Sequence, residues 1–300
     1  MIDKIIYSPA SYKATESALK LISAHCEGCR KITLGKSVLG RDISAVKIGT
    51  GESVVLYAGC FHPIEDLTVN LLLRFIWDIA VKYDSRSLAA GINIRSALEG
   101  RSVVIAPLIN PDGLEIRRQG CSAAEIFEDT VFDICSEDTS LWNANARGVD
   151  LNHNFDAGHD ILRKMEIAEG ITGPSRAKYG GPYPESEPET RALTEFCRNE
   201  RVLSVTAFHS QGEEIYYTYE GYAPERSALI ARILSSFSKY TLVSPTGTAS
   251  HGGFKDWFIK EFSRPGFTIE IGKGENPLPL SMLDSIYSDL FETMVYGIIL

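Results

Sequence analysis

Four short apolar runs restrict the folds open to this 300-residue chain more than any other feature of its sequence. None of them alternates strictly with polar residues, and near-continuous apolar runs are typical of strands that helices cover on both faces. The runs are Val54–Gly59, Val103–Ile109, Leu203–Phe208 and Phe267–Ile271. They predict an α/β fold, in which a mixed, mainly parallel twisted sheet carries helices on both faces.

Amphipathic segments and shorter apolar segments supply the other predicted elements. Further strands are expected at Ile43–Ile48, Ile215–Tyr219 and Thr241–Val243, and helices at Ser11–Ala24, Leu67–Lys82, Ser186–Asn199, Glu225–Lys239, Gly253–Phe262 and Ser281–Ile298. The stretch from about residue 120 to residue 181 has weak periodicity, so we expect a long excursion that carries residues of a functional site. The chain contains no internal repeat or linker, and residues 1–300 are expected to form a single domain.

Charge, the N-terminal segment and the cysteines limit the partners and the compartment of the chain. A net charge of −9 and a pI near 5.3 argue against nucleic acid or an anionic membrane surface as the main partner. The N-terminal segment lacks the apolar stretch of a signal peptide, and no segment approaches the length of a membrane span. We therefore expect a cytoplasmic protein with no nucleic-acid and no membrane partner. Of the six cysteines, only Cys26 and Cys29 form a C-x-x-C pair, and we expect them to be reduced structural thiols.

Two histidines and a glutamate stand at the ends of predicted strands. His62 follows the run Val54–Gly59, and Glu65 comes three residues later, so both side chains can point at one atom. His209 directly follows the run Leu203–Phe208. In α/β sheets, ligands bind at the carboxyl ends of strands, and two imidazoles with one carboxylate are the donor set of an open catalytic zinc site. The alternative is that the histidines are hydrogen-bonded structural residues.

Glu270 is the only charged residue within the apolar run from Gly266 to Gly272. Burying an unpaired carboxylate costs several kcal/mol, so an interior glutamate needs a partner. Beside a metal, a carboxylate can act as the general base that takes a proton from water and returns it to a leaving amine. The alternative is an edge strand that exposes Glu270 to solvent. Together with the predicted zinc ligands, Glu270 indicates an enzyme that hydrolyses an amide.

The order of motifs along the chain resembles that of the zinc metallocarboxypeptidase family. The motifs are His62-x-x-Glu65, Asn110-Pro-Asp-Gly113, Gly148-Val-Asp-Leu-Asn152, His209-Ser210, Gly252-Gly-Phe-Lys-Asp-Trp257 and Glu270. The C-terminal third is most similar to the bacterial gamma-D-glutamyl-diaminopimelate peptidases, through Gly253–Ile259, Pro265–Gly272 and Lys273–Pro277. The resemblance implies a zinc carboxypeptidase-like fold and a single zinc peptidase catalytic domain.

The resemblance also implies roles for individual residues. One Zn²⁺ per chain would be held by His62, Glu65 and His209, with Glu270 as the general base and acid. Asp150 would orient the imidazole of His62. Apart from this resemblance, Asn110–Gly113 and Gly148–Val149 would be interpreted as turns.

The chain departs from the family pattern in the residues that would bind substrate. Exopeptidases of the family hold a terminal carboxylate with an adjacent Asn-Arg pair, whereas this chain has Asn152-His153 and lacks the bidentate guanidinium. We expect both residues to contact substrate. The arginine that would polarise the scissile carbonyl is replaced by Asn143, and Arg147 is the candidate substitute that would stabilise the oxyanion. Thr248 stands where the family has a tyrosine.

In the zinc metallocarboxypeptidase family that the chain resembles, the position of Lys255 lies at the base of the pocket for the residue on the C-terminal side of the cleaved bond. It would favour a side chain that ends in an anion, such as diaminopimelate. The alternative is a solvated helix lysine. We therefore expect a zinc peptidase that cleaves the gamma-D-glutamyl-diaminopimelate amide of muropeptides, which would be its small peptide partners. Two alternatives stay open: a zinc carboxypeptidase or N-acyl amino acid deacylase of the same fold, and a non-catalytic metal module that binds muropeptides.

Overall fold

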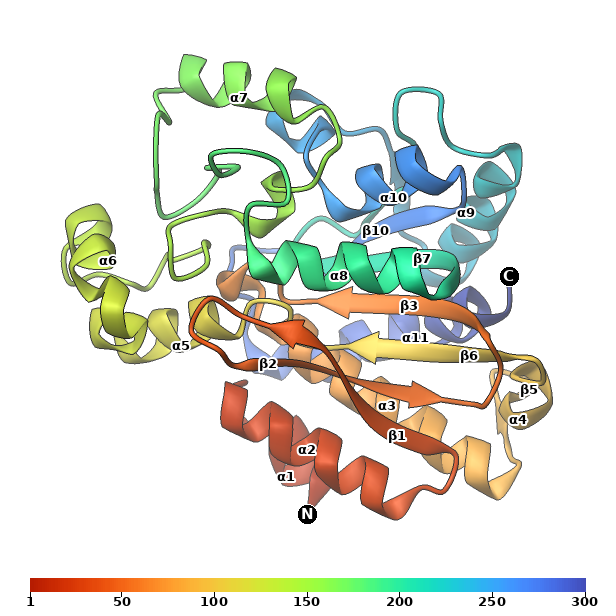
Figure 1. The fold of residues 1–300 in the computed structure, drawn as a ribbon. Helices are drawn as coiled ribbons and strands as arrows, with labels where there is room; N and C mark the ends of the chain where they lie inside the picture. Colours follow the sequence, from red (N-terminus) through yellow and green to blue (C-terminus); the bar gives the residue numbers. More distant parts are fainter.

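A mixed eight-stranded sheet forms the centre of the computed structural model, which describes residues 1–300 (Figure 1). The strands, in spatial order, are β1 (Cys29–Lys36), β2 (Asp42–Ile48), β6 (Arg101–Ala106), β3 (Ser53–Gly59), β7 (Arg201–His209), β10 (Gly266–Glu270), β8 (Glu214–Tyr216) and β9 (Thr241–Val243). The four central strands, β6, β3, β7 and β10, are parallel, whereas the pairs β1–β2, β2–β6 and β10–β8 are antiparallel. The predicted α/β fold with a mixed, mainly parallel sheet is therefore confirmed.

Helices pack on both faces of the sheet and bury two hydrophobic clusters. The larger cluster lies under α1 (Ile2–Ile6), α2 (Tyr12–His25), α3 (Leu67–Ser85), α9 (Glu225–Ser238) and α11 (Leu283–Ile299), and the smaller one under α8 (Pro188–Asn199) and α10 (Phe254–Phe262). Alternate residues of β3 enter opposite clusters: Tyr57 packs in the larger one, and Leu56 in the smaller one. Because both faces of the strand are buried, its sequence is apolar without interruption.

The predicted helices and central strands are present, with differences at some ends. β6 ends at Ala106 rather than at Ile109, because Pro107 has no backbone N–H to continue the ladder. β8 ends at Tyr216 rather than at Tyr219. The prediction missed β1, an edge strand in which most residues are partly or fully exposed, so that it lacks an apolar run.

The excursion between residues 120 and 181 contains helices that the sequence did not predict. They are the 3₁₀ segments η2 (Cys121–Phe127) and η3 (Leu151–His153) and the helices α6 (Glu128–Cys135) and α7 (His159–Ala168). Figure 1 places α6 and α7 at the margin of the molecule, outside the layers of the sheet. Only His159, Leu162 and Glu166 of α7 are buried, so two of its three buried residues are polar.

Several short elements complete the structure. They are β4 (Leu88–Ala89), β5 (Ile92–Asn93), α4 (Ile94–Ala97), α5 (Pro111–Gln119), η1 (Pro63–Glu65), η4 (Gly247–Ser250) and η5 (Leu280–Met282). The motif that begins at Asn110, interpreted as a turn, instead starts α5: the Asn110 side chain accepts a hydrogen bond from the backbone N–H of Gly113 at 2.9 Å. None of the helices is long and apolar enough to cross a membrane. The assignment of residues 1–300 to one catalytic domain stays a prediction.

The parallel strands bring the candidate site residues to one edge of the sheet. His62 follows the end of β3, His209 is the last residue of β7, and Glu270 is the last residue of β10. β7 lies between β3 and β10, and Glu270 pairs in register with His209. The site is therefore positioned by strand pairing.

Candidate metal centre

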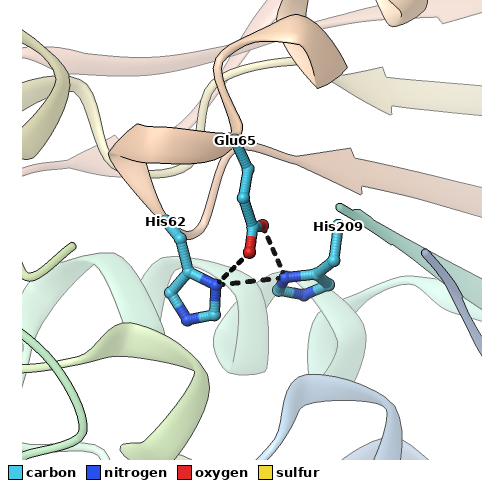
Figure 2. A group of neighbouring side chains, drawn as sticks. All are labelled: His62, Glu65 and His209. Atoms are coloured by element: carbon cyan, nitrogen blue, oxygen red, sulfur yellow. Dashed lines mark hydrogen bonds and ion pairs between the residues drawn. The ribbon is translucent and has the colours of Figure 1, made fainter. Parts of the chain in front are cut away.

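His62, Glu65 and His209 point their side chains at one another (Figure 2). Glu65 Oε1 lies 2.8 Å from Nδ1 of His62, and Glu65 Oε2 lies 2.9 Å from Nδ1 of His209. The two Nδ1 atoms are 3.3 Å apart. Ligand atoms bound to one tetrahedral zinc at its usual bond lengths are separated by roughly 3.4 Å, so the two imidazoles have the spacing of a shared ion.

Local backbone geometry brings Glu65 beside His62. Pro63 begins the single 3₁₀ turn η1, which its fixed φ angle favours, and the N–H of Glu65 donates to the carbonyl of His62 at 3.0 Å. The turn places both side chains on the same side of the chain. Thr68 holds this turn in place, since its hydroxyl donates to the carbonyl of Glu65 at 2.7 Å.

Asp150 contacts the far side of the His62 ring. Its Oδ1 lies 2.9 Å from Nε2 of His62, and its two carboxylate oxygens accept hydrogen bonds from the backbone N–H groups of Asn152 and Lys178, at 3.1 and 2.9 Å. Burial opposes the ionisation of Asp150, but His62, His153 and the N–H of Lys178 lower its pKa below the usual range. An ionised Asp150 only accepts, so Nε2 of His62 carries a proton and Nδ1 presents its lone pair to Glu65.

Two acceptors, Nδ1 of His62 and a carboxylate oxygen of Glu65, thus face each other in a buried site. Only a positive charge between them makes this arrangement favourable. Burial lowers the pKa of His62, but Glu65 and Asp150 outweigh it and raise the pKa well above its usual value. A metal ion can supply this positive charge in place of the added proton. With two imidazole nitrogens, one carboxylate and an open side, the donor set fits catalytic zinc.

Glu270 lies next to the three candidate ligands and faces the same cavity. Its strand, β10, pairs with β7 on one side and β8 on the other, so the alternative of an exposed edge strand is wrong. Burial and the neighbouring charge of Glu65 raise the pKa of Glu270 well above its usual value. The carboxyl group can therefore hold a proton that an exposed glutamate would lose.

A cavity of about 150 Å³ opens beside the candidate ligands. Among the residues predicted to bind substrate, Asn152, His153 and Lys255 all line it. Nδ1 of His153 lies 2.8 Å from the carbonyl of Lys178 and 3.0 Å from Glu166, so both acceptors fix the orientation of the ring.

Lys255 is buried, with only 4% of its side chain exposed. Its ammonium donates to the carbonyl of Thr218 at 2.7 Å and to the carboxylate of Asp256. The alternative of a solvated helix lysine is therefore wrong. Lys255 instead places a positive charge in the wall of the cavity.

The structure does not bring Arg147 to the cavity. Its guanidinium donates to Glu187 at 3.5 Å and lies over the ring of Phe127. It is therefore turned toward a buried carboxylate outside the site, and its position gives no support to the predicted role as oxyanion stabiliser. Asn143 lies nearer to the candidate ligands, since its side chain accepts a hydrogen bond from Ile64 at 3.4 Å.

For several other residues of the cavity wall, no role was predicted from the sequence. They include Tyr216, His251, Asp256 and Thr268. Asp256 could have been predicted as a site residue, because it directly follows Lys255 in the Gly252–Trp257 motif. Tyr216 could not have been predicted as a site residue, because it lies on the short strand β8 outside every motif.

Comparison with known proteins assigns the fold and the site to a family. The sequence profile described as zinc carboxypeptidase matches residues 15–293. This chain belongs to the zinc carboxypeptidase family. As a member it is a zinc metallopeptidase, a hydrolase that acts on peptide bonds, and the resemblance found in the sequence is confirmed.

Curated relatives of this zinc carboxypeptidase include two bacterial proteins. Gamma-D-glutamyl-L-diamino acid endopeptidase 1 of Lysinibacillus sphaericus is 32% identical over 269 residues, which are 89% of this chain and 66% of that protein. YqgT of Bacillus subtilis is 32% identical over 264 residues, 87% of this chain and 69% of its own length. The chain therefore spans about two thirds of the length of these relatives.

Solved structures show the same fold. Thrombin-activatable fibrinolysis inhibitor superposes with a TM-score of 0.75 at 19% identity, over 97% of this chain and 74% of that one. Murein-tripeptide amidase MpaA of Escherichia coli O157 superposes with a TM-score of 0.54 at 21% identity, over 89% of this chain and 91% of that one. At these identities the superpositions support the zinc carboxypeptidase fold alone.

Replacing Asp150 with asparagine tests its effect on the metal centre. The amide carries no charge and no longer fixes the tautomer of His62, so we expect Asp150→Asn to weaken zinc binding by about 10–100-fold. Competition with a chromogenic zinc chelator measures the affinity. Asp156→Asn, an exposed aspartate that bonds Lys260, is the matched control. Unchanged zinc affinity in a folded Asp150→Asn protein would contradict the role.

Proposed function

We propose that this zinc carboxypeptidase hydrolyses the amide between gamma-D-glutamate and diaminopimelate in peptidoglycan peptides. The observation that carries the proposal is the buried ammonium of Lys255 in the wall of a cavity that also contains the metal centre. Such a charge favours a substrate side chain with its own anion. The sequence similarity to gamma-D-glutamyl-L-diamino acid endopeptidase 1 supports the same substrate class.

In the proposed enzyme, His62, Glu65 and His209 would hold one zinc ion per chain. When bound, zinc would polarise the scissile carbonyl and acidify a water molecule. Glu270 takes the proton of the attacking water on its carboxylate and delivers it to the nitrogen of the leaving diamino acid. Burial and the charge of Glu65 raise the pKa of Glu270, which helps its carboxyl group to keep the proton until it reaches the leaving nitrogen.

Asn152 and His153 replace the pair that would hold a terminal carboxylate in an exopeptidase. The Asn152 side chain accepts a hydrogen bond from the N–H of Phe254 at 3.0 Å, so its amide NH₂ can face substrate. Neither residue offers the bidentate fork of a guanidinium. The cavity therefore favours a substrate whose distinguishing anion is on the side chain, near Lys255, over ordinary trimming of C-terminal residues. We also propose a muropeptide as the partner, while the cytoplasmic location stays a prediction.

Product analysis tests the proposed reaction directly. We expect zinc-loaded protein to convert L-Ala-gamma-D-Glu-meso-diaminopimelate into L-Ala-D-Glu and free diaminopimelate, and a chelator to stop the reaction. Mass spectrometry of the products is the measurement. Activity confined to N-acyl amino acids would favour the deacylase alternative. Binding without hydrolysis by zinc-loaded protein would favour the non-catalytic module.

Replacing Glu270 with glutamine tests the proton transfer. We expect Glu270→Gln to lower kcat about 10²–10⁴-fold, because an amide cannot take up the proton of the attacking water. Zinc content, measured by elemental analysis, should stay at the wild-type level, since Glu270 is outside the ligand set. Glu213→Gln, a glutamate that pairs with Lys273 nearby, serves as the control. Near-wild-type turnover in Glu270→Gln would refute the assignment.

Replacing Lys255 with methionine tests the source of specificity. Methionine keeps much of the length of the side chain but removes its charge, and a hydrogen bond to a charged group contributes about 1.5–3 kcal/mol. We expect kcat/KM to fall about 10–100-fold for the diaminopimelate peptide and much less for the corresponding lysine peptide. Lys260→Met, on the same helix but with 36% of its side chain exposed, is the control. Equal losses on both peptides would rule out the specificity role.

A further inference from the structure

Lys255 and Asp256 form a buried ion pair in the wall of the cavity. Their side chains are only 4% and 3% exposed, and both residues line the cavity. They are adjacent in the first turn of α10, which begins at Phe254, directly after Gly253. Removing two charges from water is costly, and an apolar pair of similar volume would often be as stable or more stable. A buried pair placed beside a substrate cavity therefore suggests a functional reason.

The ammonium of Lys255 keeps one donor for a ligand. A lysine ammonium has three N–H groups, and two of them are used, one by the carbonyl of Thr218 and one by Asp256. The third can donate to an anion in the cavity. Lys255 is thus fixed in position by its protein partners and still able to bind a carboxylate.

Asp256 presents a negative charge at the same place. Lys255 contacts its Oδ1, while its Oδ2 lies beside Gly253, where a Cβ atom would come within 2.8 Å of that oxygen. Gly253 also lines the cavity, so the absence of a side chain there leaves room next to the carboxylate. The other carboxylates that line the cavity, Glu65 and Glu270, belong to the metal centre. Asp256 is therefore the acidic group available to a ligand cation away from the scissile bond.

We propose that Lys255 and Asp256 act together to recognise a side chain that ends in both a carboxylate and an ammonium. Lys255 binds the carboxylate, and Asp256 binds the ammonium. This inference rests on the proposed function, and it narrows the substrate to peptides whose residue after the cleaved amide carries a zwitterionic end. The distal carbon of meso-diaminopimelate, which bears one amino and one carboxyl group, has this chemistry.

The pair rejects side chains that carry only one of the two charges. A lysine side chain can place its ammonium at Asp256, but it leaves Lys255 without a ligand carboxylate and brings a second cation close to that ammonium. A side chain that ends in a carboxylate alone can pair with Lys255, but it leaves Asp256 without a ligand ammonium and brings a second anion close to that carboxylate. Like charges repel strongly when they are held close together beside buried groups, so the pair selects by repulsion as well as by attraction. The net charge of the pair is zero, which matches the zero net charge of the zwitterionic end.

Four peptides test the inference with the intact zinc-loaded protein. All have the form L-Ala-gamma-D-Glu-X, where X is meso-diaminopimelate, lysine, 2-aminopimelate, or diaminopimelate amidated at its distal carboxyl. In that order, the side chain of X ends in both charges, in the ammonium alone, in the carboxylate alone, and in the ammonium with a neutral amide. We expect kcat/KM to be highest for meso-diaminopimelate and at least about tenfold lower for each of the other three.

Two single substitutions test the charges of Lys255 and Asp256 one at a time. In Asp256→Asn, we expect kcat/KM for the diaminopimelate peptide to fall at least about tenfold, and its advantage over the 2-aminopimelate peptide to disappear. In Lys255→Met, we expect the advantage over the lysine peptide to disappear instead. Glu261→Gln, an exposed glutamate of the same helix, is the matched control for Asp256→Asn and should keep the wild-type ranking.

A double variant keeps the test valid if a single substitution prevents folding. Lys255→Met with Asp256→Asn removes both charges and leaves neither buried without its partner. We expect this protein to bind zinc as the wild type does and to cleave all four peptides with similar kcat/KM.

Three results would overturn the inference. Equal losses on all four peptides in Asp256→Asn, with normal zinc content, would make Asp256 a structural residue. Equal wild-type rates on the diaminopimelate and 2-aminopimelate peptides would also refute it. In both cases the proposed function stands as long as free diaminopimelate is released. A zinc-loaded wild type that cleaves none of the peptides would instead overturn the proposed function, and this inference with it.

Discussion

Backbone pairing of the parallel strands β3, β7 and β10 is the constraint on which the site depends. β7 lies between the other two, so the segment after β3 carries His62 to the place where β7 ends at His209. The register of β10 sets Glu270 beside His209. Residues that are far apart in sequence are thus held by the hydrogen bonds of a buried sheet, which gives a hydrolytic centre the rigidity that flexible loops lack. Only Glu65 reaches the centre through a local turn, the 3₁₀ segment after His62.

The charges around the cavity divide into two groups with different tasks. At one end, the carboxylates of Glu65 and Asp150 flank the His62 ring and create a site that requires a cation. Elsewhere in the wall, the Lys255–Asp256 pair carries both signs and no net charge. The first group accounts for the chemistry that the zinc carboxypeptidase family shares. In our proposal, the second group selects the substrate, which membership of the family leaves open.

The elements that could be predicted from the sequence are those whose own residues form a recognisable pattern, such as an apolar run. The β3 run is apolar throughout because its two faces enter two clusters, so both the strand and the position of His62 after it could be predicted. Contacts between segments that are distant in sequence could not be predicted. Helix α7 was missed because it buries His159 and Glu166 along with a single leucine. Arg147 was proposed as a site residue because it follows Asn143 by four positions, but its guanidinium instead pairs with Glu187, which is distant in sequence.

Anomalous diffraction from crystals of the zinc-loaded protein, recorded on both sides of the zinc absorption edge, tests the central claim most directly. We expect one strong peak per chain, within about 2.0–2.2 Å of Nδ1 of His62, Nδ1 of His209 and a carboxylate oxygen of Glu65. We also expect Nε2 of His62 to stay hydrogen-bonded to Asp150. A peak at any other group of residues, or no peak in protein that retains zinc by elemental analysis, would contradict it.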